Sequence, residues 1–136
     1  MQSFRLIKKI QLTILNLLFI SGVFADPIGD VTESTGIGTL LRGNDDVKNS
    51  IGTDVLLYDE AKTGNGRMKI TLLDREVIDM TEHTNVYIDE AYYDPNPSLS
   101  KLSLRMVQGT ARFTSGAGQR IRKENINVST PTAQIT

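Results

Sequence analysis

Residue types that carry out chemistry are sparse in this chain of 136 residues. The sequence has one histidine, His83, and no cysteine. A histidine acts as a metal ligand or a general base only where partner groups converge on it, and no such partner is visible around residues 82–84. Serine and threonine are frequent, but no Gly-x-Ser-x-Gly elbow marks one of them as a nucleophile. We therefore interpret His83 as a surface residue and predict no catalytic residue, no cofactor and no enzyme activity.

Two acidic clusters have the oxygen atoms that hard cations prefer. Residues 44–46 are followed by Asp54, and residues 89–90 are followed by Asp94. Calcium takes about six to eight oxygen ligands, and the loop spacing of the recognised calcium motif is absent from both clusters. We interpret both as solvated turns and predict no metal site.

Three tyrosines form the one aromatic grouping of the sequence. Tyr87, Tyr92 and Tyr93 lie shortly before Pro95 and Pro97. An exposed tyrosine offers a flat apolar face with a polar tip, which suits a sugar, a peptide or a protein surface. The alternative is that these rings pack in the core and at the sheet edge, under a long loop. The three tyrosines are the candidate partner surface.

The elements that must position these residues are strands, because apolar residues recur with period two rather than 3.6. Over residues 67–73, Met68, Ile70 and Leu72 share one face and the polar residues between them share the other. Further strands are expected over residues 37–42, 55–58, 77–80, 86–88, 101–107, 111–113 and 126–128. About eight short strands without a helical stretch predict a single all-β domain, built as a sandwich, a roll or a short β-solenoid.

Glycine and proline predict where these strands stop. Residues 64–66 read Gly-Asn-Gly, and an Asn-Gly step supplies the positive φ angles of a tight hairpin turn. Residues 94–97 contain two prolines, which remove backbone donors and restrict their predecessors. Residues 26–35 are polar and contain proline and glycine, so we expect them to be a leader that precedes the domain.

The first 25 residues have the pattern of a secretory signal peptide. Basic residues at 5, 8 and 9 precede an apolar run over residues 10–20, and Val23 and Ala25 are small residues three and one positions before the expected cleavage. The alternative is an uncleaved membrane anchor, but the run is shorter than the roughly 20 apolar residues of a spanning helix. Cleavage would leave a mature chain that starts at Asp26 and has no stable membrane span. Both interpretations make the protein periplasmic or exported.

Removal of residues 1–25 leaves twelve basic residues against sixteen acidic ones, a net charge of about −4. Nucleic acid and anionic lipid both require a basic face, so neither is expected as a partner. No disulfide can form, and a mature chain of this length is large enough to fold around one core by burial alone.

Eight short pieces of sequence follow one another in a particular order along residues 36–136. They are residues 36–38, 42–43, 54–57, 63–66 running into 68–74, 84–88, 102–104, Gly109, and 128–131. In this order they resemble the FecR-domain family, the periplasmic module of bacterial cell-surface signalling proteins that respond to ferric siderophores. The resemblance implies a non-enzymatic binding or signal-relay module with a protein or envelope partner. The alternative is a structural protein that contacts cell-wall polysaccharide or another surface component.

The chain departs from the family pattern at two places. The family usually has Asp-Gly-Ser after the central strand where this chain has Asp74-Arg75-Glu76, so the turn is made without glycine or is longer. The signalling members also have a cytoplasmic segment that controls a sigma factor, whereas only nine residues precede the apolar run here. The resemblance therefore extends to the exported domain alone.

The resemblance also predicts that residues 36–136 are a domain truncated at its C-terminus. Family members continue after a Thr-Pro step, like that at residues 130–131, into a strand that ends in Val-x-Gly-Thr. The sequence stops at Thr136, partway along that strand. An unfinished edge strand exposes backbone groups that pair readily with another chain.

Overall fold

The computed structural model describes residues 26–115, 121–131 and 134–135, which form one open, mixed β-sheet. The expected signal peptide and its cleavage site at Ala25 lie outside the described residues. The strands are β1 (Gly29–Arg42), β2 (Asp45–Lys48), β3 (Asp54–Val55), β4 (Glu60–Leu72), β5 (Val77–Met80), β6 (Asn85–Tyr92), β7 (Lys101–Gln108), β8 (Ala111–Thr114), β9 (Ile126–Ser129) and β10 (Gln134–Ile135). Two short 3-10 helices, η1 (Pro97–Leu99) and η2 (Lys123–Asn125), interrupt the loops. The all-β prediction is confirmed.

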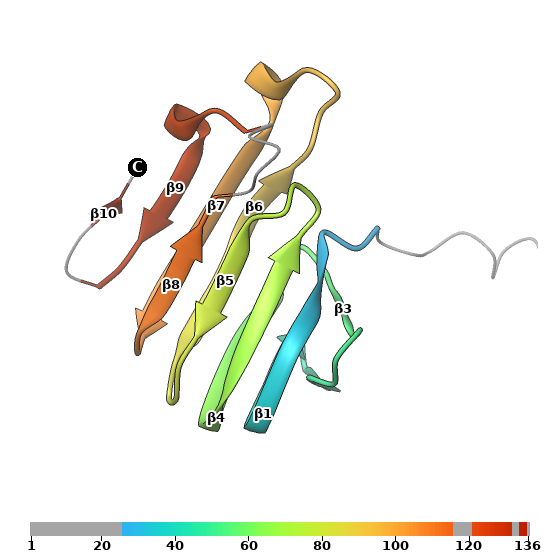
Figure 1. The fold of residues 1–136 in the computed structure, drawn as a ribbon, viewed down its shortest axis with the longest axis vertical. Coiled ribbons are helices and arrows are strands. Elements are labelled where there is room, and N and C mark those ends of the chain that lie inside the picture. The colour runs from blue at the N-terminus through green and yellow to red at the C-terminus, as the bar shows by residue number, and fades with distance from the viewer. Residues whose placement is uncertain (1–25, 116–120, 132–133, 136) are drawn as a thin grey trace, which may run out of the picture.

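The strands follow the order β10-β9-β7-β6-β4-β1-β2, with β3 paired to β1 and β5 paired to both β4 and β8 (Figure 1). Neighbouring strands are antiparallel except for β7 and β9, which are parallel. A solenoid would instead stack parallel strands coil upon coil. Because most pairs here are antiparallel, the described strands do not form a solenoid. They form one open sheet that folds back on itself.

Strand β4 is long enough to belong to both parts of this folded sheet. Its first residues, 60–62, pair with β6, and its later residues, 68–71, pair with β5. One part continues through β5 to β8, and the other continues through β6 and β7 to β9. Ile78 and Phe113 of the first part and Val86 and Leu104 of the second line the same apolar cavity of about 340 Å³. The hydrophobic core therefore lies between the two parts.

The period-two pattern of the central strand is confirmed. Met68, Ile70 and Leu72 are at most 2% exposed, while the residues between them are half-buried. β5 has the bounds that the sequence predicted, and β7 and β8 agree with prediction to within one residue at each end. Alternation is reliable here because one face of each strand packs on the core and the other meets water.

The turn expected at residues 64–66 is wrong, because these residues lie inside β4. They face β1 where the pairing register shifts between Gly36 and Gly38. A Cβ atom on Gly66 would lie 2.3 Å from the Thr35 carbonyl oxygen and 2.5 Å from the Ile37 amide nitrogen. Glycine is required at this position for close backbone approach rather than for a turn.

The leader expected over residues 26–35 is wrong from Gly29 onward. Strand β1 begins at Gly29, and Val31 is fully buried opposite Ile70 of β4. The strand expected over residues 55–58 is also shorter than predicted, because β3 ends at Val55 and Tyr58 has a φ of 70°.

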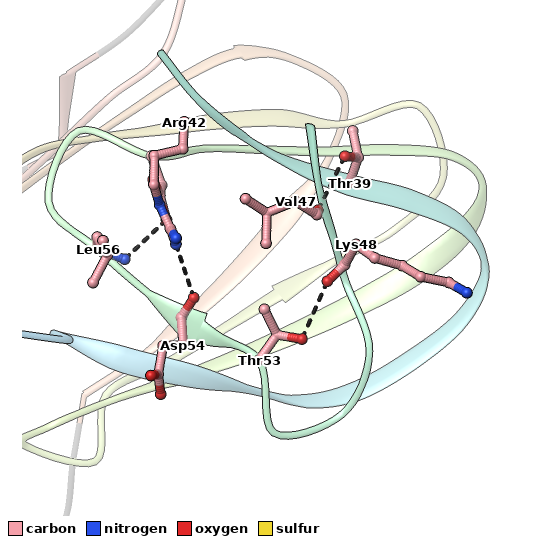
Figure 2. A network of polar contacts seen from close by, with 8 residues as sticks. Thr39, Arg42, Val47, Lys48, Thr53, Asp54 and Leu56 are labelled. Carbon is pink, nitrogen blue, oxygen red and sulfur yellow. Dashed lines mark hydrogen bonds and ion pairs between the residues drawn. The ribbon is translucent and has the colours of Figure 1, made fainter. Parts of the chain in front are cut away.

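Polar contacts hold the segment between β1 and β4 in place (Figure 2). The Thr39 hydroxyl donates to the Val47 carbonyl at 3.2 Å, and the Thr53 hydroxyl donates to the Lys48 carbonyl at 3.1 Å. Arg42 Nη2 donates to the Asp54 carbonyl at 3.1 Å. The bonds from Thr39 and Arg42 tie β2 and β3 to the long strand β1, and the bond from Thr53 closes the loop between β2 and β3.

The turn between β4 and β5 is made without glycine, as one of the two sequence alternatives predicted. Arg75 takes a φ of 67°, its amide donates to the Leu72 carbonyl at 2.9 Å, and the Leu72 amide donates to the Glu76 carbonyl at 2.8 Å. Asp74 and Glu76 on either side of Arg75 are both buried.

Among the described residues, no helix is long and apolar enough to cross a bilayer.

Candidate functional site

Tyr87 lies on the outer face of the sheet. In β6, Val86 and Ile88 point into the core, so Tyr87 between them points away from it. Its cross-strand neighbours are Glu60 on β4 and Arg105 on β7. Pairing thus places an aromatic ring between a carboxylate and a guanidinium on the outer face, where Glu60 and Tyr87 are half-buried and Arg105 is exposed.

Arg105 covers the ring of Tyr87. Its guanidinium carbon lies 4.3 Å from the ring centroid, which is a cation–π distance. Arg105 Nε and Nη2 also donate to the two carboxylate oxygens of Asp89, at 2.9 Å and 3.2 Å. The Arg105 side chain is nevertheless 47% exposed. Tyr87, Arg105 and Asp89 form a charged surface whose guanidinium is held in place, and we call it the Tyr87 surface.

The electrostatics of the Tyr87 surface follow from its neighbours. A hydrogen bond to Glu60, followed by burial, raises the pKa of the Tyr87 hydroxyl. The hydrogen bond to Asp89 raises the pKa of Arg105. Tyr87 therefore stays neutral and Arg105 stays charged at neutral pH, so this surface can both donate and accept hydrogen bonds.

The structure separates the other two predicted tyrosines from Tyr87. The pairing of β6 with β7 shifts between Ile88 and Glu90, and beyond this shift Tyr92 is exposed while its hydroxyl lies 2.7 Å from an Asp94 carboxylate oxygen. Tyr93 packs against the core. The surface interpretation thus fits Tyr87 and Tyr92, and the core-packing alternative fits Tyr93.

A second set of functional groups lies at the turn between β4 and β5. Asp74 and Glu76 line a cavity of about 280 Å³, and both side chains are buried. Burial raises the pKa of Glu76, and the negative charge of Asp74 raises it further. Burial, followed by the charges of Glu76 and Asp74, also raises the pKa of Tyr93. We call the cavity that Asp74 and Glu76 line the carboxyl cavity; Tyr93 is close enough for both charges to affect its pKa.

The carboxyl cavity is not predicted from the sequence, although a signal for it exists. Residues 74, 76, 78 and 80 are all buried. The alternation that points every second residue of β5 into the core therefore extends into the preceding turn, where it includes Asp74 and Glu76. From the sequence, Tyr93 is a candidate for the partner surface with Tyr87 and Tyr92, and core packing is the alternative. Its approach to Glu76 joins residues 17 positions apart and depends on the folding of the sheet.

The remaining candidate residues lie apart from both sites. His83 is exposed in the turn between β5 and β6, with a φ of 52°. Of the two acidic clusters, Asp45 and Asp46 are exposed on β2, and Asp89 is bound by Arg105. In the part of the chain that the structure describes, no group of three His, Cys, Asp or Glu residues is arranged to hold a metal ion.

Comparisons of this chain with protein-family models, with curated proteins and with solved structures found no match. Two places in the described part of the chain bring functional groups together: the Tyr87 surface on the outer face of the sheet and the carboxyl cavity at the turn between β4 and β5.

Proposed function

We propose that this chain is a non-enzymatic, exported binding or signal-relay module resembling the FecR domain, and that the Tyr87 surface is where it binds its partner. One observation carries the proposal: Arg105 lies over Tyr87 while Asp89 fixes its guanidinium. Tyrosine and arginine contribute disproportionately to protein interfaces. A side chain that is already held in place loses less conformational entropy when a partner binds.

The same contact favours a protein over a polysaccharide as the partner. A sugar stacks on a free aromatic face, but one face of Tyr87 is occupied by the guanidinium of Arg105 at 4.3 Å. The exposed edge of this group presents guanidinium donors, which bind carboxylates and backbone carbonyl oxygens of proteins. A polysaccharide would instead have to use Tyr92, a residue that is 53% exposed.

Export is the second part of the proposal. The basic start, the apolar run over residues 10–20 and the small residues before Asp26 support a cleaved signal peptide and a periplasmic or secreted location. Amino-terminal sequencing of the protein recovered from the periplasm or medium is expected to begin at Asp26. Recovery of a membrane-bound protein that begins at Met1 or Gln2 would show that the segment is retained.

The partner surface is tested by site-specific cross-linking. A photoreactive phenylalanine derivative is placed at Tyr87, or at the exposed Arg67 on β4 as a matched control. We expect position 87, but not position 67, to cross-link to one protein that mass spectrometry identifies. Cross-links to polysaccharide alone would support the envelope-structural alternative.

The purified partner then allows a quantitative test. We expect Tyr87→Ala and Arg105→Ala each to weaken its binding about tenfold or more, the size of an interface hot spot, whereas Arg67→Ala leaves the dissociation constant unchanged. Equal binding by all three variants would rule out the Tyr87 surface as the binding site.

A further inference from the structure

Strand β8 is an open edge of the sheet. In the part of the chain that the structure describes, its one neighbour is β5, and the two pair antiparallel without a register shift. Just before β8, the Thr81 amide donates to the Thr110 carbonyl at 3.1 Å. Because bonded and non-bonded pairs alternate along an antiparallel ladder, the backbone groups of Ala111 and Phe113 point away from β5. A further strand can bond to these groups.

The two parts of the folded sheet differ in width at this edge. Beyond β4, the first part consists of β5 and β8, whereas the second consists of β6, β7, β9 and β10. The second part therefore has more strands than the first. Val128 on β9 packs against the core but is only half-buried. A strand added beside β8 would widen the narrower part of the sheet.

An apolar cavity of about 340 Å³ lies at this edge. Strands β5 and β8 line it from one part of the sheet, and β6, β7 and β9 line it from the other. All of its lining residues except Thr130 are apolar, and Met106, Ala111, Phe113 and Val128 among them are half-buried. Side chains of an added strand point alternately to the two faces of the sheet. Apolar side chains on the inner face of that strand would be buried against this cavity.

The outer face of the same strands has a row of alternating charges that ends at β8. Glu33 of β1 lies opposite Lys69 of β4, and the two form an ion pair at 3.2 Å. Lys69 lies in turn opposite Asp79 of β5, and Asp79 lies opposite Arg112 of β8. Arg112 is exposed. Opposite charges on directly opposed residues stabilise a sheet, so an acidic residue would continue the row on the next strand.

We propose that the edge of β8 binds an extended segment of a partner protein, which adds one strand to the sheet. The outward residue of this segment opposite Arg112 is acidic, and its inward residues are apolar and lie against the cavity beside Phe113. Strand addition of this kind combines backbone hydrogen bonds with pockets for alternate side chains. Pairing of β8 with β8 of a second copy would instead bring two Arg112 side chains together. The edge uses no residue of the Tyr87 surface, so this contact is separate from the proposed partner site.

The probes are three short peptides, each titrated into the protein recovered after export and followed by NMR of backbone amides. The acidic peptide is acetyl-Ser-Glu-Val-Glu-Val-Ser-amide. In the basic peptide lysine replaces both glutamates, and in the polar peptide serine replaces both valines. We expect the acidic peptide to shift the amides of residues 111–114 and to protect those of Ala111 and Phe113 from hydrogen exchange. The basic and polar peptides should each bind about fivefold more weakly or less tightly still.

Variants test the role of charge and of the open edge. Arg112→Glu is expected to reverse the preference, so that the basic peptide binds more tightly than the acidic one, whereas Arg67→Glu at another exposed position leaves the preference unchanged. A general loss of structure would weaken both peptides and could not reverse their order. Ala111→Pro removes an amide that points to the open edge, where proline is tolerated in a strand, and should weaken both peptides. Circular dichroism checks that the variants fold.

Four outcomes would overturn the proposal. If no peptide shifts the amides of residues 111–114, the edge does not accept a strand. If the acidic and basic peptides bind the wild type equally, Arg112 does not select the segment. If the polar peptide binds as well as the acidic one, the cavity takes no part. If the protein alone dimerises and the same amides shift with its concentration, the occupant of the edge is a second copy of this chain.

Discussion

Arg42 donates two hydrogen bonds to the carboxylate of Asp59, from Nε at 3.0 Å and from Nη2 at 2.9 Å. The Asp59 side chain is fully buried, whereas that of Arg42 is 35% exposed. Arg42 also reaches the carbonyl of Asp54 (Figure 2), and the bond to Asp59 raises the pKa of Arg42. One bidentate pair thus fixes the end of β1 to the segment that leads from β3 into β4.

Removing Arg42 should leave Asp59 as an unpaired buried charge. We expect Arg42→Ala to lower the free energy of unfolding by about 3 kcal/mol, at the low end for a buried pair because water reaches the arginine side chain. The exposed Arg67→Ala is the matched control and should cost less than about 0.5 kcal/mol. Urea unfolding of both variants measures the difference, and equal costs would show that the pair is not structural.

The two faces of β4 should differ in their tolerance of substitution. Ile70 is fully buried in the core, so Ile70→Ala should cost about 2–5 kcal/mol. Lys69 forms an ion pair with Glu33 at 3.2 Å, but both side chains meet solvent, so Lys69→Ala should cost less than about 1 kcal/mol. Thermal or urea unfolding distinguishes them. Similar losses on both faces would contradict the register of β4.

Two glycines on the same strand provide a test of close backbone approach. Gly66→Ala would place a Cβ atom 2.3 Å from the Thr35 carbonyl oxygen, and the backbone must move to admit it, so we expect a loss of about 1–3 kcal/mol or more. At Gly64 the nearest atom would be a methyl carbon of Ile37 at 3.3 Å. Gly64→Ala should therefore change the unfolding free energy by less than about 1 kcal/mol. Indistinguishable midpoints would show that β1 and β4 are not this close.

Strands with one face in the core could be predicted from the sequence, because alternation records burial directly. This is why β5 was predicted at both of its ends, and β7 to within one residue. The first half of β1 was not predicted because polar residues surround Val31, and only its pairing with Ile70 makes it a core position. An Asn-Gly step favours a turn locally. Here the backbones of β1 and β4 approach so closely that Gly66 is required inside a strand.

The candidate sites were predictable only in part, for the same reason. The sequence singled out Tyr87 by residue type, but its contact with Arg105 depends on the register between β6 and β7. The effect of the Glu76 charge on the pKa of Tyr93 likewise depends on how the sheet folds. Local patterns identify which residues have useful chemistry, whereas tertiary pairing decides which of them act together.

The burial of Glu76 makes the stability of the domain depend on pH. Burial raises the pKa of Glu76 above its ordinary value of 4.5, so the folded state binds a proton that the unfolded chain releases more readily. The stabilisation from this proton is fully present below the ordinary pKa. It is lost as the pH rises from the ordinary pKa through the raised pKa of the folded state.

Glu76→Gln should remove this dependence, because glutamine stays neutral at every pH. We expect the free energy of unfolding of the wild type, relative to Glu76→Gln, to decrease as the pH rises from the ordinary pKa of a glutamate through the raised pKa of Glu76 in the folded state. Urea unfolding without added ligand measures it, and the exposed Glu90→Gln should follow the wild type throughout. The opposing result is a difference in free energy of unfolding between the wild type and Glu76→Gln that is the same at every pH. That result would mean that Glu76 has the same pKa in the folded and unfolded states. In that case the carboxylate must already have a donor in the folded protein, and its burial would not raise its pKa.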